Sequence, residues 1–180
     1  MKDKFLEQAK HEYSPKQRLI ALLCLAPIFL FLLPDLFIRL GARLDQWLQW
    51  PPIFSQPFNL IFGWLLILPS WLLGMWANSS QFTIGRGTPV PLMATQKLIA
   101  QPPYTFCRNP MALGAIGMYL GTAILFRSIG AVILVLLCAG LLLIYIKRVE
   151  EKEMEIRFGQ DYLAYKQQTP FLIPRFWNRL

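Results

Sequence analysis

The chain has 180 residues, 55% of them hydrophobic, and a formal net charge of +8. Soluble domains average about 45–50% apolar residues, so this composition favours a membrane protein over a soluble one. A basic chain can also bind nucleic acid, but no basic stripe with interleaved aromatic residues is present. We therefore predict no nucleic-acid partner.

Four apolar segments predict an all-α, polytopic membrane helix bundle: residues 19–38, 58–76, 110–126 and 129–146. Each is close to the ~20 residues that cross ~30 Å of hydrocarbon, although the third and fourth are short. We expect the third and fourth helices to form a hairpin and a helical tail to follow them. Residues 1–76 then form an N-terminal arm with two spans, and residues 77–180 form a second region with a loop, the hairpin and the tail.

Lysine and arginine are distributed unevenly between the segments that connect the spans. Fifteen lie in the N-terminal arm, the 77–109 loop and the tail, and three (Arg39, Arg43 and Arg127) lie on the other side. Basic residues accumulate on the cytoplasmic side, so we expect a multi-pass protein of a bacterial inner membrane or endomembrane with both termini in the cytoplasm. The basic segments would lie against anionic lipid headgroups.

The first span contains Pro27 and Pro34, which should kink the helix. Asp35 is the only acidic residue inside a span, and Arg39 follows at i+4. We interpret the two as an ion pair at the membrane interface. Residues 36–48 have one apolar face and predict an amphipathic helix on the membrane surface.

The loop over residues 77–109 is longer than the ~12–15 residues beyond which loops are usually functional or disordered. It contains Gly-Arg-Gly-Thr-Pro-Val-Pro at residues 85–91 and ends with Pro-Pro-Tyr at residues 102–104. Residues 92–100 predict one short helix. The loop can be either a lid over a site or a plain connector.

The third span begins with a pattern that is typical of a helix start. Asn109 is a preferred N-cap and Pro110 a preferred first helical residue. Free amide groups at a helix start attract anions, and Arg108 adds a bidentate donor. The alternative is an ordinary cap beside an arginine at the membrane interface.

Gly114, Gly117 and Gly121 lie on one face of the third span. Such spacing allows helix backbones to approach closely, so packing is the first interpretation. Gly114 could also leave room for a ligand, and the face of Gly117 and Gly121 allows a homodimer.

The fourth helix should continue past residue 146 and stop at Gly159, because glycine is a frequent C-terminal cap. A second short helix should then carry Tyr162 and Tyr165 on one face and end at Pro170.

Glu150 and Glu151 are the first acids beyond the fourth span. If the last two spans form an antiparallel hairpin, these acids reach the same membrane face as Arg108. Fixed charges of both signs would then be available to hold a charged cofactor beside hydrocarbon. The alternative is an ordinary solvated charge run.

The chain has one histidine, His11. A metal site built from several histidines is therefore excluded, and a histidine-activated nucleophile is not expected. We predict no metal cofactor, and group transfer that needs only positioned charges stays open.

These motifs together resemble membrane methyltransferases of the isoprenylcysteine carboxyl methyltransferase and phosphatidylethanolamine N-methyltransferase type. The resemblance covers residues 85–174. It is carried by Gly-x-Gly-Thr-Pro-x-Pro at 85–91, Pro-Pro-Tyr at 102–104, Arg-Asn-Pro-Met-Ala-Leu-Gly at 108–114, Glu-Glu at 150–151, the tyrosines at 162 and 165, and Thr-Pro-Phe-Leu-Ile-Pro at 169–174.

The resemblance implies an enzyme that transfers methyl groups from S-adenosylmethionine to a lipidic or prenylated substrate, with carboxyl O-methylation of an isoprenylcysteine-like acceptor as the first choice. It implies a cofactor pocket on the cytoplasmic side, with Arg108 and Glu151 as the catalytic residues. The cofactor-binding residues that it implies are Tyr104, Arg108, Asn109, Pro110, Gly114, Glu150 and Glu151.

Three residues depart from the family pattern. Pro102 replaces a glycine, Ala112 replaces a tyrosine, and Phe171 stands where a basic residue is common. Three other functions stay open: N-methylation of a phospholipid amine, a nicotinamide-dependent membrane reductase of the sterol-reductase type, and a non-catalytic membrane scaffold.

Overall fold

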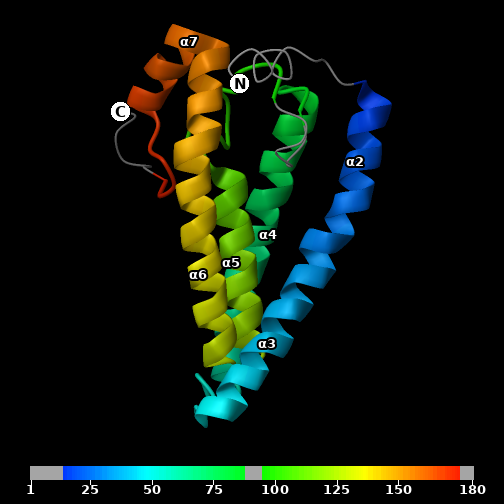
Figure 1. The fold of residues 1–180 in the computed structure, drawn as a ribbon, viewed down its shortest axis with the longest axis vertical. Helices are drawn as coiled ribbons and strands as arrows, with labels where there is room; N and C mark the ends of the chain where they lie inside the picture. Colours follow the sequence, from blue (N-terminus) through cyan, green and yellow to red (C-terminus); the bar gives the residue numbers. More distant parts are fainter. Residues whose placement is uncertain (1–13, 88–94, 175–180) are drawn as a thin grey trace. The chain divides into compact units, whose positions relative to one another are not determined.

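The computed structural model describes residues 14–87 and 95–174. Within these ranges the chain forms helices and loops and no strand (Figure 1), which confirms the predicted all-α class. Two of the segments, η1 and η2, are π-helical. The elements in chain order are α2 (Pro15–Pro27), η1 (Ile28–Leu32), α3 (Leu33–Leu48), α4 (Phe58–Thr83), α5 (Pro110–Leu125), α6 (Ile129–Tyr145), η2 (Ile146–Glu150) and α7 (Glu151–Gln168).

Three continuous helices are long and apolar enough to cross a membrane: Pro15–Leu48, Phe58–Thr83 and Ile129–Gln168. The third predicted span is α5, which is apolar but has only 16 residues. At ~1.5 Å per residue it extends about 24 Å, less than the ~30 Å of a typical hydrocarbon core. Three of the four predicted spans are therefore found at full length, and the other is a shorter apolar helix.

The described chain divides into two compact units. The first unit comprises residues 1–25, 75–111 and 144–180, and the second comprises residues 26–74 and 112–143. Helices α2, α4, α5 and α6 contribute residues to both units. The predicted division of the chain at residue 76 stays a prediction.

In the second unit, the glycine face of α5 packs against α4. A Cβ atom on Gly114 would lie 2.7 Å from the Ser70 carbonyl oxygen, and one on Gly121 would lie 2.9 Å from the Gly63 carbonyl oxygen. Gly117 faces the Ser70 side chain in the same way. The packing interpretation is confirmed. Because α4 of the same chain lies against that face, the homodimer through Gly117 and Gly121 stays a prediction.

The first apolar helix differs from the prediction of a kinked span followed by a separate surface helix over residues 36–48. It runs without interruption from Pro15 to Leu48 through the π-helical segment η1. Asp35 and Arg39 form the predicted i,i+4 ion pair at 2.7 Å, with both side chains more than half exposed.

The π-helical segment leaves one backbone carbonyl without a partner inside its own helix. The Leu33 amide donates to the Ile28 carbonyl, five residues back. Pro34 has no amide hydrogen, so in the same register the Phe29 carbonyl receives no backbone donor. The Tyr119 hydroxyl of α5 donates to that carbonyl at 2.8 Å. A side chain of the second unit therefore satisfies the carbonyl that the proline leaves free.

A tight turn joins α5 to α6 and gives the predicted hairpin (Figure 1). Arg127 adopts a positive φ of 62° in this turn. The Ser128 hydroxyl accepts from the Ala131 amide at 2.9 Å, and the Asp45 carboxylate accepts from the Gly130 amide at 2.7 Å. These two acceptors satisfy amide groups that every helix start leaves unpaired.

The connection between α4 and α5 is shorter than predicted, because α4 continues to Thr83. The predicted helix over residues 92–100 is wrong for residues 95–100, which are irregular, and residues 92–94 lie outside the described ranges. The amides of Gln96 and Lys97 donate to the Gly85 carbonyl at 2.7 and 3.1 Å. Amide groups committed to that distant carbonyl are not available for a helical ladder.

The tail follows the prediction closely. The helix continues through η2 into α7 and breaks at Gly159, which has φ 53° and ψ −126°. That conformation suits glycine because it has no Cβ. The second half of α7 ends at Gln168, Thr169 is extended, and Pro170 follows.

We predict that Tyr119→Phe lowers the free energy of unfolding by about 1–2 kcal/mol, because it leaves the Phe29 carbonyl without a donor. Thermal unfolding of the purified protein in detergent would measure the change. Tyr145→Phe is the matched control, since the Tyr145 hydroxyl makes no hydrogen bond in the described part of the chain. Equal stability of the two variants would contradict the role given to Tyr119.

Candidate active site

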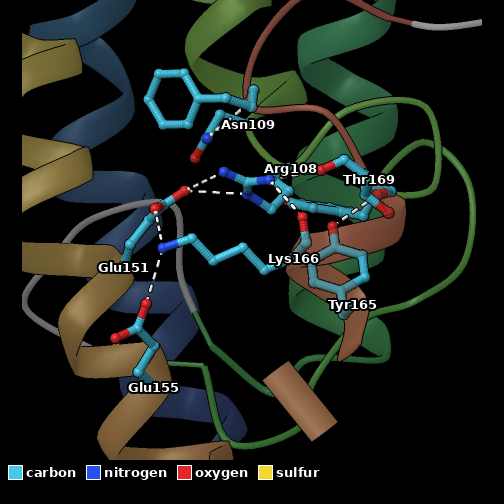
Figure 2. A network of polar contacts seen from close by, with 9 residues as sticks. Arg108, Asn109, Glu151, Glu155, Tyr165, Lys166 and Thr169 are labelled. Atoms are coloured by element: carbon cyan, nitrogen blue, oxygen red, sulfur yellow. Dashed lines mark hydrogen bonds and ion pairs between the residues drawn. The ribbon is translucent and has the colours of Figure 1, made fainter. Parts of the chain in front are cut away.

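The Arg108 guanidinium and the Glu151 carboxylate form a buried ion pair in the first unit (Figure 2). Arg108 precedes α5 and Glu151 begins α7. Arg108 Nε and Nη2 both donate to Glu151 Oε1, at 3.0 and 2.7 Å. The side chains are only 11% and 4% exposed. The prediction that the arginine meets one of the two glutamates is confirmed.

The same guanidinium binds the tail that follows α7. Arg108 Nη1 donates to the carbonyl oxygens of Lys166 and Thr169, at 3.0 and 2.5 Å. The Arg108 amide donates to the Pro170 carbonyl at 2.8 Å. Most of the hydrogen bonds that Arg108 can donate therefore go to other residues of the protein. Through them its side chain joins the start of α5 to both halves of α7.

Phe171 contacts both Arg108 and Asn109, which together with Glu151 and Lys166 form the corner of the first unit described here. Its ring centre is 5.7 Å from Arg108 Cζ, and its carbonyl accepts from Asn109 Nδ2 at 2.9 Å. The resemblance expects a basic residue at this position, where a second cation would face the guanidinium. An aromatic ring instead offers a favourable cation–π contact. Pro110, which is fully buried, begins α5 as predicted.

Lys166 neutralises the other side of Glu151. Lys166 Nζ lies 2.8 Å from Glu151 Oε2 and 2.8 Å from Glu155 Oε1. Both oxygens of Glu151 are thus engaged by cations, Oε1 by Arg108 and Oε2 by Lys166. Sequence reasoning missed Lys166, because only the break at Gly159 brings it back to Glu151.

Glu150 has a different environment from its neighbour. It is half-buried, ends the π-helical segment η2, and forms no ion pair with any described residue. The Glu151 amide donates five residues back, to the Ile146 carbonyl. Single π turns occur frequently at functional sites. Here such a turn ends at the first of two consecutive acids, of which the second, Glu151, is fully paired and the first has no ion pair with a described residue.

Tyr104 is held between α4 and α7. Its hydroxyl lies 3.3 Å from Gln81 Oε1 and 3.4 Å from the Ala77 carbonyl, and its own carbonyl accepts from the Tyr165 hydroxyl at 2.6 Å. Burial, and to a smaller degree nearby negative charge from Cys107 and Glu150, raises the pKa of the Tyr104 hydroxyl above its usual range. Tyr104 therefore stays neutral and acts as a donor.

A second arginine connects the loop to α7. Arg157 Nη2 donates to Glu153 Oε1 at 3.0 Å, as the i,i+4 spacing predicts, and Nη1 donates to the Thr95 carbonyl. Gln81 Nε2 donates to Thr95 Oγ1 at 3.2 Å. The described end of the loop is thus fastened to both α4 and α7. Whether the loop acts as a lid stays a prediction.

The structure does not test two of the residues that the sequence analysis singled out, Gly114 and His11, as ligand-binding residues. Gly114 belongs to the second unit, where α4 fills the space beside it, so packing accounts for the glycine and its cofactor role stays a prediction. His11 lies outside the described residues. Across residues 14–87 and 95–174, no group of three or more His, Cys, Asp or Glu side chains could hold a metal ion.

The sequence model of the family described as phospholipid methyltransferase matches residues 58–161, more than half of the chain. The chain belongs to the phospholipid methyltransferase family. No curated protein and no solved structure matches it. The predicted family resemblance is confirmed, and a family of methyltransferases disfavours the nicotinamide-dependent reductase.

Family membership and the three long apolar helices make this phospholipid methyltransferase family member an integral membrane protein. The matched segment includes Arg108, Asn109, Glu150 and Glu151 but ends before Lys166. The corner around Arg108 is therefore built partly from the matched segment and partly from the tail beyond it.

We predict that Arg108→Lys lowers the free energy of unfolding by about 2–3 kcal/mol, because one amine cannot replace a buried guanidinium that serves a carboxylate and two carbonyls. Thermal unfolding in detergent without any ligand would measure the loss. Arg148→Lys is the matched control, because Arg148 is exposed and forms no ion pair with a described residue. Unchanged stability of the Arg108 variant would show that the observed contacts do not hold the tail.

Proposed function

We propose that the protein transfers a methyl group from S-adenosylmethionine to the polar end of a lipidic acceptor. The observation that carries this proposal is the contrast between the two glutamates. Glu151 is neutralised by Arg108 and Lys166, whereas Glu150 is half-buried and forms no ion pair with a described residue. A carboxylate that is partly removed from water and left unpaired gains most from a cationic ligand.

The donors and acceptors around Glu150 fit the groups that S-adenosylmethionine carries. Glu150 offers acceptor oxygens for an ammonium group or for ribose hydroxyls. Arg108 uses four of its five N–H groups within the chain, which leaves one for a carboxylate. The start of α5 offers further unpaired amide groups. Together these groups would offer partners for a cation, for hydroxyls and for an anion.

When bound, S-adenosylmethionine supplies a methyl group on a positively charged sulfonium. Methyl transfer is an in-line displacement that needs alignment and exclusion of water more than acid–base groups. Glu150 would hold the cofactor at its cationic or ribose end. Arg108, Glu151, Lys166 and Glu155 balance one another in charge, so they fix the geometry without adding net charge to the site. Tyr104 stays neutral, and its hydroxyl is directed at the Ala77 carbonyl and Gln81 Oε1, so it helps to fix the loop before α5.

The acceptor we propose is a carboxylate on an isoprenylcysteine-like lipid. A carboxylate is already ionised near neutral pH and needs no base, which suits a site with no histidine among the described residues. A phospholipid amine is the second candidate, because the family description names phospholipids. An amine must first lose a proton, and Glu150 is the available carboxylate that could accept it.

We further propose that the site faces the cytoplasm. Fifteen of the eighteen lysines and arginines lie in the termini and in the loop before α5, and such residues favour the cytoplasmic side. A water-soluble cofactor would then enter from the cytoplasm while a lipidic acceptor reaches the site from the bilayer.

We predict that Glu150→Gln weakens binding of S-adenosylhomocysteine by about tenfold, the change expected for losing one charged hydrogen bond. The variant should unfold at the wild-type temperature, because Glu150 forms no ion pair with a described residue that the substitution would remove. Calorimetry with the detergent-solubilised protein would measure the affinity, and Asp161→Asn, an exposed acid on α7, is the control. If wild type binds reduced nicotinamide and not S-adenosylhomocysteine, the methyltransferase assignment fails.

The acceptor chemistry predicts what happens to the transferred label. Lipid extract incubated with the protein and radiolabelled S-adenosylmethionine should give a product that releases volatile methanol on treatment with base, as a methyl ester does. Label that stays with the lipid would indicate the amine instead. The Glu150→Gln variant should incorporate less of either label, whereas a non-catalytic scaffold predicts no incorporation by any variant.

A further inference from the structure

Lys166 contacts the buried Arg108–Glu151 ion pair through two different groups, its backbone carbonyl and its side-chain amine. Its backbone carbonyl accepts from Arg108 Nη1 at 3.0 Å, and its amine binds Glu151 and Glu155 at 2.8 Å each (Figure 2). The family match ends at residue 161, so Lys166 lies beyond it. The carbonyl contact does not depend on the side chain. Substitutions at this position can therefore remove the amine while the backbone contact to Arg108 remains.

We infer that Lys166 is a positioning residue, which locks the Glu151 carboxylate so that Glu150 alone is presented to the cofactor. This inference rests on the proposed function. It gives the two consecutive glutamates separate roles: Glu151 belongs to the frame, and Glu150 binds the ligand. Lys166 is the residue that keeps these roles apart.

The arrangement of charges along α7 supports this role. Glu151 and Glu155 are one turn apart on the first half of α7, where like charges repel. Lys166 lies on the second half, after the break at Gly159, and its amine sits between both carboxylates. The lysine therefore links the second half of α7 to its first half across the break at Gly159. Its side chain is 34% exposed while that of Glu151 is 4% exposed, so the amine reaches inward to a carboxylate that water cannot stabilise.

Loss of the amine would leave Glu151 Oε2 buried without a cation. Arg108 would still pair with Oε1, but a buried carboxylate oxygen that has lost its partner is unfavourable. Glu151 can relieve it by taking up a proton, which weakens its pairing with Arg108, or by turning toward the cation that Glu150 should hold. Both responses disturb the geometry around Glu150, so both weaken cofactor binding.

The test compares three variants of the full-length protein in detergent, with S-adenosylhomocysteine as the calorimetric probe. Lys166→Met should raise the Kd by about tenfold, the effect of one charged hydrogen bond, at a temperature where the protein is folded. Lys166→Arg keeps a cation within reach of both carboxylates and should stay within about threefold of wild type. Lys152→Met removes an exposed lysine from the same helix and should change nothing.

The measured affinities of the Lys166 variants show whether the inference holds. A Lys166→Met protein that binds the probe as tightly as wild type overturns the inference, and so does a Lys166→Arg protein that loses tenfold or more. The arginine variant keeps the test decisive if the methionine variant does not fold. Wild-type protein that does not bind the probe at all would instead remove the proposed function, which separates the two failures.

Discussion

The first unit is organised around one buried carboxylate, that of Glu151. A carboxylate removed from water is costly unless cations and hydrogen bonds replace its hydration. Arg108 binds one oxygen from the start of α5, and Lys166 binds the other from the second half of α7. Because neither cation is a sequence neighbour of Glu151, satisfying this one group brings three distant parts of the chain to the same place.

The two cations differ in what else they contact, and this difference sets the shape of the corner. The planar guanidinium of Arg108 also takes the carbonyls of Lys166 and Thr169, so it fixes backbone as well as charge. The amine of Lys166 takes a second carboxylate, that of Glu155. Two positive and two negative groups therefore balance. The remaining acid nearby, Glu150, is the only one of this set with no described ion pair, and it gains its distinct environment from the π turn that ends at it.

The features that were predictable from sequence depend on local pattern or on helical spacing. Hydrophobicity located the spans, the Asn109–Pro110 pair located the start of α5, and Gly159 located the break in α7. The meeting of Arg108 with Glu151 followed from the length of the hairpin. The contacts of Lys166 with Glu151 and Glu155 could not be predicted, because they depend on the direction of the chain after Gly159. The two π-helical segments were also missed, since a single wider turn leaves no mark on hydrophobic periodicity, and the loop over residues 95–100 depends on a long-range hydrogen bond to Gly85.

The chemistry of methyl transfer places a further constraint on how Glu150 would serve the proposed reaction. Only interactions that are stronger in the transition state than in the ground state accelerate a step. A sulfonium loses its positive charge as the methyl group leaves, so a carboxylate placed against the sulfur would stabilise the reactant more than the transition state. The ammonium and ribose groups keep their charge and hydrogen bonds throughout. In the proposed reaction Glu150 would therefore help most by holding the end of the cofactor away from the sulfur, where it would add affinity and alignment without raising the barrier. A frame that is neutral overall, built from Arg108, Glu151, Lys166 and Glu155, meets the same requirement, because it adds no net negative charge that would hold the sulfonium in its charged state.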